Sequence, residues 1–290
     1  MSISERQVRQ HNTSYEKWGD DWISLRDPFT GEDFLPDRPP RSLEMQPGLR
    51  EGLNYLRNNP DIHITIFGDN HGDADETNAR EAQTVLGTCD SVFLEGYGVQ
   101  QEEQDLFWNV CEAGKGMEVS KDVIDRLGQY KMRQLKILAS CRKPVMFPEI
   151  PAGGTPYERD LLDFNLIFDE LRPRALAGDE GFALATEINL AVGVVMREWY
   201  MLAKMGLFMQ MYEKVSGDKL THPMIWIGSE HLVSMPSKIA GLGLSTITHS
   251  AQQSVRNTPA RSVYGDYERT NGSLPVMEAA RDGLARLIKT

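Results

Sequence analysis

The sequence has no long hydrophobic run and no apolar leader. Its longest apolar stretch, LAVGVVM at 190–196, is closed by Arg197 and falls well short of the ~18 apolar residues that a membrane-spanning helix needs. The N-terminal residues MSISERQVRQH lack the apolar core of a signal peptide. We therefore expect a cytoplasmic protein with no membrane as its partner.

Cysteine is also scarce, and basic residues are fewer than acidic ones. Cys89, Cys111 and Cys141 are odd in number, far apart and free of any C-x-x-C spacing, which argues against a disulfide framework, a zinc knuckle and a redox dithiol. The 31 Lys and Arg against 42 Asp and Glu leave a formal charge of −11, which argues against nucleic acid as a partner. No Walker-type loop or dinucleotide fingerprint is present, since GGTP at 153–156 lacks the lysine. The expected partner is a small-molecule or peptide substrate.

The chain is expected to hold an irregular N-terminal arm, 1–47, and a single α/β domain, 48–290. The arm is polar and punctuated by proline, but it carries four large aromatic residues, which a disordered arm would rarely have: Trp18, Trp22, Phe29 and Phe34. At 290 residues the chain is long enough to bury a sizeable core.

Short apolar runs alternate with helical patterns after residue 47. Strands are predicted at 62–67, 91–95, 143–147, 224–228 and 244–248. Helices are predicted at 48–58, 75–87, 100–113, 119–141 and 276–288, together with a long helical stretch at 157–215 that is broken near LRPRALAGDEG and a helix or turn after SEH at 229–231. This order predicts an α/β fold with a mainly parallel β-sheet flanked by helices.

Two of the predicted strands end in the same pattern. IFGDNH at 66–71 and WIGSEH at 226–231 each consist of an apolar strand, a glycine, two polar residues and a histidine. We expect the glycine to let the chain turn sharply out of the sheet. In an open parallel sheet this places His71 and His231 at the carboxyl edge, where ligands bind. The strand SVFLE brings Glu95 to the same edge, so the three side chains suit either a metal site or a general base with an orienting partner.

Two known families share parts of these motifs. GDNHG resembles the first motif of calcineurin-like metallophosphoesterases, but the further aspartate and G-N-H ligands of a two-metal centre are missing. The whole set of motifs is similar to the TraB/PrgY/Tiki-type family, which is distantly related to erythromycin esterases and ChaN-like proteins. Its first motif matches Gly68-Asp69-Asn70-His71, its glutamate matches Glu95, its R-D-x-Y-M segment matches 197–201 and its second motif matches 228–231.

This resemblance covers roughly residues 60–250 and implies an EreA/ChaN/TraB-like fold and a hydrolase. Tiki-like members are described as metal-dependent proteases, so His71, Glu95 and His231 would hold one divalent metal ion (Mn, Co or Zn) that activates water. Arg197 would neutralise a substrate carboxylate or the developing oxyanion.

Two alternatives to a metalloprotease stay open. In the version that resembles the erythromycin esterases, His71 activates water without metal and Glu95 orients it. In the other, which ChaN-like and PrgY-type relatives suggest, the protein binds haem or a peptide and regulates without turnover.

Further residues near the motifs are weaker candidates. Asp69 and Glu230 lie inside the G-x-x-H turns, where an acidic residue also suits a helix N-terminus. Glu149 follows the strand at 143–147, and His249 follows the last strand. Arg80 is expected to be solvated.

Overall fold

A computed structural model of the protein describes residues 30, 38–69, 76–95, 134, 137–138, 140, 143–151, 154–162, 180–232 and 235–250. Residues 41–44, which belong to the predicted arm 1–47, form the helix α2 (Arg41–Glu44), and Leu43 of this helix is completely buried in the main core. The four aromatic residues of the predicted arm lie outside the described residues.

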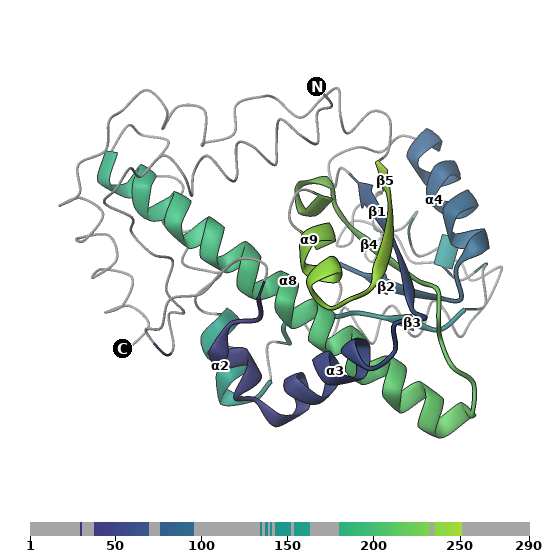
Figure 1. The fold of residues 1–290 in the computed structure, drawn as a ribbon. Coiled ribbons are helices and arrows are strands. Elements are labelled where there is room, and N and C mark those ends of the chain that lie inside the picture. The colour runs from purple at the N-terminus through teal and green to yellow at the C-terminus, as the bar shows by residue number, and fades with distance from the viewer. Residues whose placement is uncertain are drawn as a thin grey trace, which may run out of the picture.

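The described strands form one five-stranded sheet in which every pair is parallel (Figure 1). The strands are β1 (His63–Asp69), β2 (Ser91–Leu94), β3 (Val145–Met146), β4 (Pro223–Gly228) and β5 (Ser245–Ser250). Their order across the sheet is β3-β2-β4-β1-β5, so β4 is inserted between β1 and β2. The prediction of an α/β fold with a parallel sheet is confirmed.

The helices match the predicted pattern in most of the described chain. They are α3 (Pro47–Arg57), α4 (Glu76–Thr88), α8 (Glu180–Ser216), the short 3-10 helix η1 (Ser229–Leu232) and α9 (Met235–Gly241), and residues 156–162 are also helical. The predicted helix 276–288 and nearly all of 100–113 and 119–141 lie outside the described residues. The predicted long helix is continuous for 37 residues in α8.

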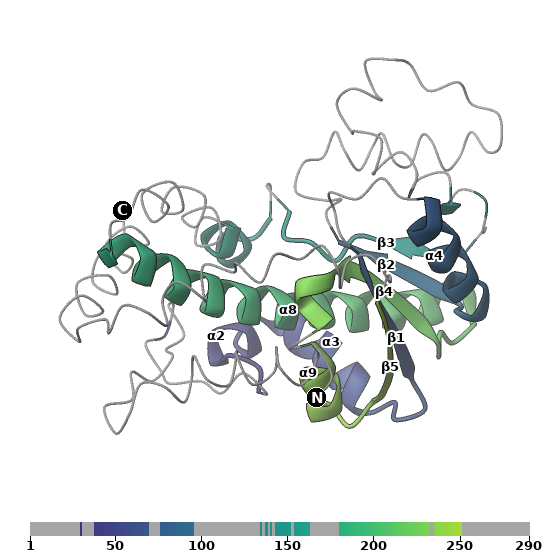
Figure 2. The same ribbon diagram turned by 90° about the horizontal axis from the view of Figure 1, so that it is seen from above.

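Helices lie on both faces of the sheet. Side chains alternate between the two faces along each strand, so both faces carry apolar residues that helices cover. Ile64 and Ile66 of β1 pack with Ile225 of β4 in the core beneath α3 and α8, whereas Phe67 and Trp226 pack with α4 on the opposite face. Figure 2 shows α4 and α3 on opposite sides of the sheet. Strands buried on both faces explain the short, nearly continuous apolar runs of the sequence.

Helix α3 crosses α8 at two glycines. A Cβ atom on Gly206 would lie 2.1 Å from the carbonyl oxygen of Gly52, and a Cβ atom on Gly52 would lie 1.9 Å from the carbonyl oxygen of Ala203. Only glycine therefore allows this distance between the two helices. The crossing fixes α8 against the core, and α8 carries Arg197.

No helix in the described part of the chain is both long and apolar enough to cross a bilayer.

Candidate functional site

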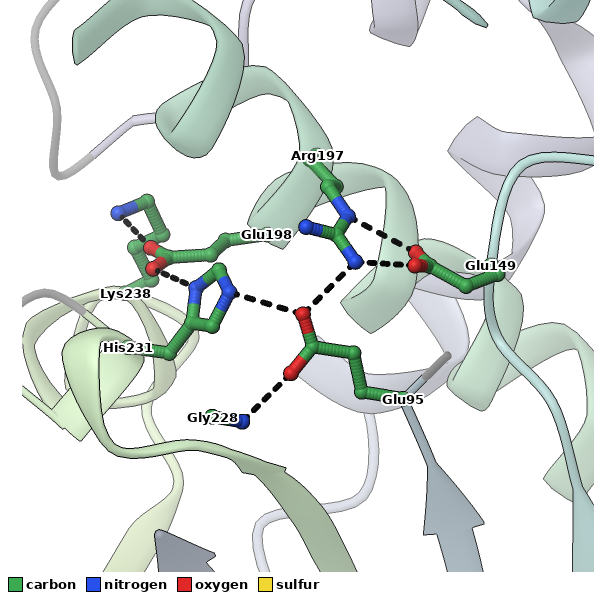
Figure 3. A network of polar contacts seen from close by, with 7 residues as sticks. All are labelled: Glu95, Glu149, Arg197, Glu198, Gly228, His231 and Lys238. Carbon is green, nitrogen blue, oxygen red and sulfur yellow. Dashed lines mark hydrogen bonds and ion pairs between the residues drawn. The ribbon is translucent and has the colours of Figure 1, made fainter. Parts of the chain in front are cut away.

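A network of buried polar side chains lies at the carboxyl edge of the sheet (Figure 3). Glu95 follows β2, Glu149 follows β3 and His231 follows β4 in η1. Helix α8 supplies Arg197 and Glu198 from above this edge, and α9 adds Lys238. Loops and helices meet at this end of a parallel sheet because each strand connection begins there.

Glu95 is 6% exposed and is held from three directions. Its Oε2 accepts a hydrogen bond from the backbone N–H of Gly228 at 2.5 Å. Its Oε1 lies 2.7 Å from Arg197 Nη2 and 3.2 Å from His231 Nε2. Three of the residues predicted from the sequence to form the site, Glu95, Arg197 and His231, are thus in direct contact.

Arg197 is oriented by Glu149. Its Nε donates to Glu149 Oε1 at 3.0 Å, and its Nη2 donates to Glu149 Oε2, so the pair is bidentate. Burial lowers the pKa of Arg197, but the charges of Glu149 and Glu95 outweigh burial and raise this pKa above its usual range. The side chain is 27% exposed, and its Nη1 makes no hydrogen bond or ion pair with the described residues. Arg197 therefore carries a fixed, charged donor group, Nη1, that no described residue uses.

His231 lies between two carboxylates. Its Nδ1 is 2.6 Å from Glu198 Oε1, and its Nε2 faces Glu95. Although burial lowers the pKa of His231, the charges of Glu95 and Glu198 raise it to about 10. The imidazole is therefore protonated at neutral pH and donates from both nitrogens.

Glu198 is stabilised as a carboxylate by a buried lysine. Lys238 Nζ donates to Glu198 Oε2 at 2.5 Å, and both side chains are completely buried. Burial raises the pKa of Glu198, but Lys238 and His231 lower it to about 2. Neither Glu198 nor Lys238 was predicted from the sequence. The acidic residue of the R-D-x-Y-M pattern was the available signal for Glu198, and nothing in the sequence distinguishes Lys238.

Opposite charges alternate along the whole network. Three carboxylates and three cations follow one another in the order Glu149, Arg197, Glu95, His231, Glu198, Lys238. The six charges cancel only when His231 is protonated. Buried charges persist when they are paired and hydrogen-bonded in this way.

The glycine of the first motif has a different role from the one expected. Gly68 does not end the strand, because β1 continues to Asp69, and its φ is not positive. A Cβ atom on Gly68 would lie 2.4 Å from Leu232 Cδ1. The glycine therefore makes room for Leu232, the residue after His231, and brings the two G-x-x-H segments into contact.

The other sequence candidates are not among the six charged residues of the network or lie outside the described residues. Asp69 is buried at the end of β1, and its Oδ2 accepts a hydrogen bond from Trp226 Nε1 at 2.9 Å. His249 and Arg80 are exposed, on β5 and α4. His71 and the side chain of Glu230 lie outside the described residues.

The predicted metal site is described only in part, because His71 lies outside the described residues and the other two predicted ligands, Glu95 and His231, contact each other. A metal-bound histidine must offer a lone pair, whereas both ring nitrogens of His231 face carboxylate oxygens, of Glu198 at 2.6 Å and of Glu95 at 3.2 Å. A cation bound to Glu95 Oε1 would also stand beside the guanidinium of Arg197, which is 2.7 Å from that oxygen. In the described part of the chain, no three His, Cys, Asp or Glu residues are placed to share a metal ion.

No protein-family model, curated protein or solved structure matches the chain. The similarity to the TraB/PrgY/Tiki-type family and the cytoplasmic location both stay predictions from the sequence.

Proposed function

We propose that the carboxyl edge of the sheet is the active site of a hydrolase that acts on an ester or peptide bond without a metal ion. The observation that carries this proposal is the state of Arg197. Glu149 and Glu95 fix its guanidinium, while Nη1 has no partner among the described residues. A charged donor that is oriented before the substrate arrives is the kind of group that stabilises a developing oxyanion.

His71 is the proposed general base. It removes a proton from water, and the water oxygen then attacks the carbonyl carbon of the substrate. Arg197 Nη1 donates a hydrogen bond to the carbonyl oxygen as negative charge develops there. The bond to the leaving group then breaks, and the leaving group takes the proton from His71.

Glu95 is proposed to orient His71 and to favour its protonated form during the reaction. Two observations support a position of His71 close to Glu95. Asp69, two residues before His71 in the sequence, is the register partner of Gly228, and the N–H of Gly228 donates to Glu95. Arg197 and His231 both contact Glu95 Oε1 and hold the carboxylate in one orientation, as a partner of a catalytic base requires.

The test is turnover of chromogenic esters and peptide anilides by protein that has been treated with a chelator. We expect chelated wild-type protein to keep its activity, and kcat/KM to fall about a hundredfold or more in His71→Ala and in Arg197→Gln. The exposed His249 provides a matched control, and His249→Gln should be as active as wild type.

Two results would contradict the proposal. Activity that disappears on chelation and returns with manganese, cobalt or zinc would support the metal-dependent version instead. Equal activity in wild type and His71→Ala would remove the proposed base.

A further inference from the structure

A pair of histidines lies at the amino edge of the sheet, at the opposite end from the candidate active site. His63 begins β1, and His222 immediately precedes β4. Thr65 is the register partner of Met224, and the N–H of His63 donates to the carbonyl oxygen of Thr221. His63 and His222 are therefore cross-strand neighbours on the same face of the sheet.

The backbone that carries the two rings is fixed on both sides. Ser245 of β5 is the register partner of His63. Asp90 Oδ2 accepts hydrogen bonds from the backbone N–H groups of Thr221 and His222, at 2.6 Å and 2.7 Å. Both histidines are half-buried. Because these contacts already fix the backbone, binding of a ligand at this pair needs little rearrangement of the main chain.

The separation of the rings suits a shared metal ion. Their centres are 5.0 Å apart, and their planes are inclined at 64°. Because a metal–nitrogen bond is about 2.0–2.1 Å, each ring centre lies roughly 3.2 Å from a bound ion, and two ligands at a tetrahedral angle have centres about 5 Å apart. The observed separation agrees with this value.

Each ring also has one nitrogen engaged with a hydroxyl group. His63 Nδ1 is 2.6 Å from Ser245 Oγ, and His222 Nε2 is 3.1 Å from Thr65 Oγ1. When each hydroxyl accepts the ring proton, His63 Nε2 and His222 Nδ1 carry the lone pairs. These two nitrogens have no hydrogen-bond partner among the described residues. Hydrogen bonds of this kind select the tautomer and orientation of metal-binding histidines.

We propose that His63 and His222 bind one divalent transition-metal ion, with water in the remaining coordination positions. Imidazole nitrogen favours copper, nickel and zinc over magnesium and calcium, and the general affinity order places copper(II) first. Because an ion held by both rings joins β1 to β4 only in the folded protein, it stabilises the native state. This site is independent of the proposed hydrolase.

Calorimetric titration of the full chain with copper(II), nickel, zinc and magnesium tests the site. We expect wild type to bind the first three ions, copper most tightly, and binding at this site to weaken at least about tenfold in His63→Gln and in His222→Gln. His249→Gln is the matched control and should bind as wild type does. Unchanged binding in both variants, or no binding of copper, nickel or zinc by wild type, would overturn the proposal.

A second measurement uses only the wild-type protein, so it does not depend on the folding of a variant. Copper(II) broadens the NMR signals of nearby amides, and we expect the strongest broadening at His63, His222 and Ser245. Broadening centred instead on Glu95 and His231 would assign the ion to the other edge of the sheet and overturn the proposal.

Discussion

His231 Nε2 lies 3.2 Å from Glu95 Oε1, and two consecutive residues of α8 hold this pair together. Arg197 contacts Glu95, and Glu198 contacts His231. Successive residues of an α-helix point about 100° apart, so neighbouring side chains reach different partners from one turn. A shift of α8 would therefore disturb both halves of the network at once (Figure 3).

Replacing Lys238 with methionine should destabilise the fold. The substitution leaves the carboxylate of Glu198 buried without its lysine, and breaking a buried pair in this way costs about 3–5 kcal/mol. Urea denaturation measures this cost. Lys219→Met is the control, because Lys219 pairs with Asp61 at the surface, where solvent screens the pair and its loss should change the stability much less. Equal losses in the two variants would contradict a special role of the buried pair.

Stability should fall on both sides of neutral pH. The pKa of His231 is raised from 6.5 to about 10, so its stabilising contribution is complete below pH 6.5 and is lost as pH rises towards 10. The pKa of Glu198 is lowered from 4.5 to about 2, so its contribution is complete above pH 4.5 and is lost as pH falls towards 2. Unfolding midpoints across this range measure the effect. In His231→Asn the decline above pH 6.5 should be shallower than in wild type, and an identical decline would show that His231 does not cause it.

Replacing Arg197 with lysine should abolish most turnover although the charge is kept. An ammonium group cannot make the bidentate contact to Glu149, contact Glu95 and still present a fixed donor to the substrate. We expect kcat/KM to fall about a hundredfold, measured with the best ester or peptide of the proposed assay. Arg80→Lys, on the exposed face of α4, should leave it unchanged. Normal activity in Arg197→Lys would mean that charge alone is needed.

Gly206→Ala should destabilise the crossing of α3 and α8. Its new Cβ atom would meet the carbonyl oxygen of Gly52 at 2.1 Å, and backbone cannot yield as a flexible side chain can. A cost of at least about 1–3 kcal/mol is expected from denaturant unfolding. Gly48→Ala in α3 meets no atom within 4 Å and should be neutral or slightly stabilising. A neutral Gly206→Ala would show that the helices can separate freely.

Gly68→Ala and Leu232→Ala should show coupled effects on stability. Alanine at position 68 overlaps Leu232, so Gly68→Ala alone should cost about 1–3 kcal/mol. In the double variant the overlap is removed, and the loss should be smaller than the sum of the two single losses. A full double-mutant cycle by urea denaturation measures the coupling, and strict additivity would contradict the contact between the two motif segments.

The sequence was sufficient for much of the fold. Apolar runs of strand length separated by helical patterns predict a parallel α/β sheet, and all five predicted strands are present. The strand predicted at 143–147 is shorter in the structure, where β3 covers only Val145–Met146. Among the described strands β3 lies at the edge of the sheet and pairs only with β2. The exact ends of such strands depend on neighbouring strands, which a local pattern does not contain.

Part of the site could also be read from the sequence. A polar residue directly after an apolar strand lies at the carboxyl edge of a parallel sheet, and this rule correctly brought Glu95, Glu149 and His231 to one region. The same rule gave no information about the side chain of Asp69, which accepts a hydrogen bond from Trp226. Side-chain direction at the edge depends on what packs there.

The sequence by itself determined the alternation of strands and helices and the edge at which the polar side chains gather, because both follow from local periodicity. Only the tertiary structure decided which charges pair. Glu198 and Lys238 come from separate helices, and their burial with His231 depends on how α8 and α9 pack over the sheet. The protonation of His231 follows from that packing, because burial and neighbouring charges set a pKa and neither is a property of the residue alone.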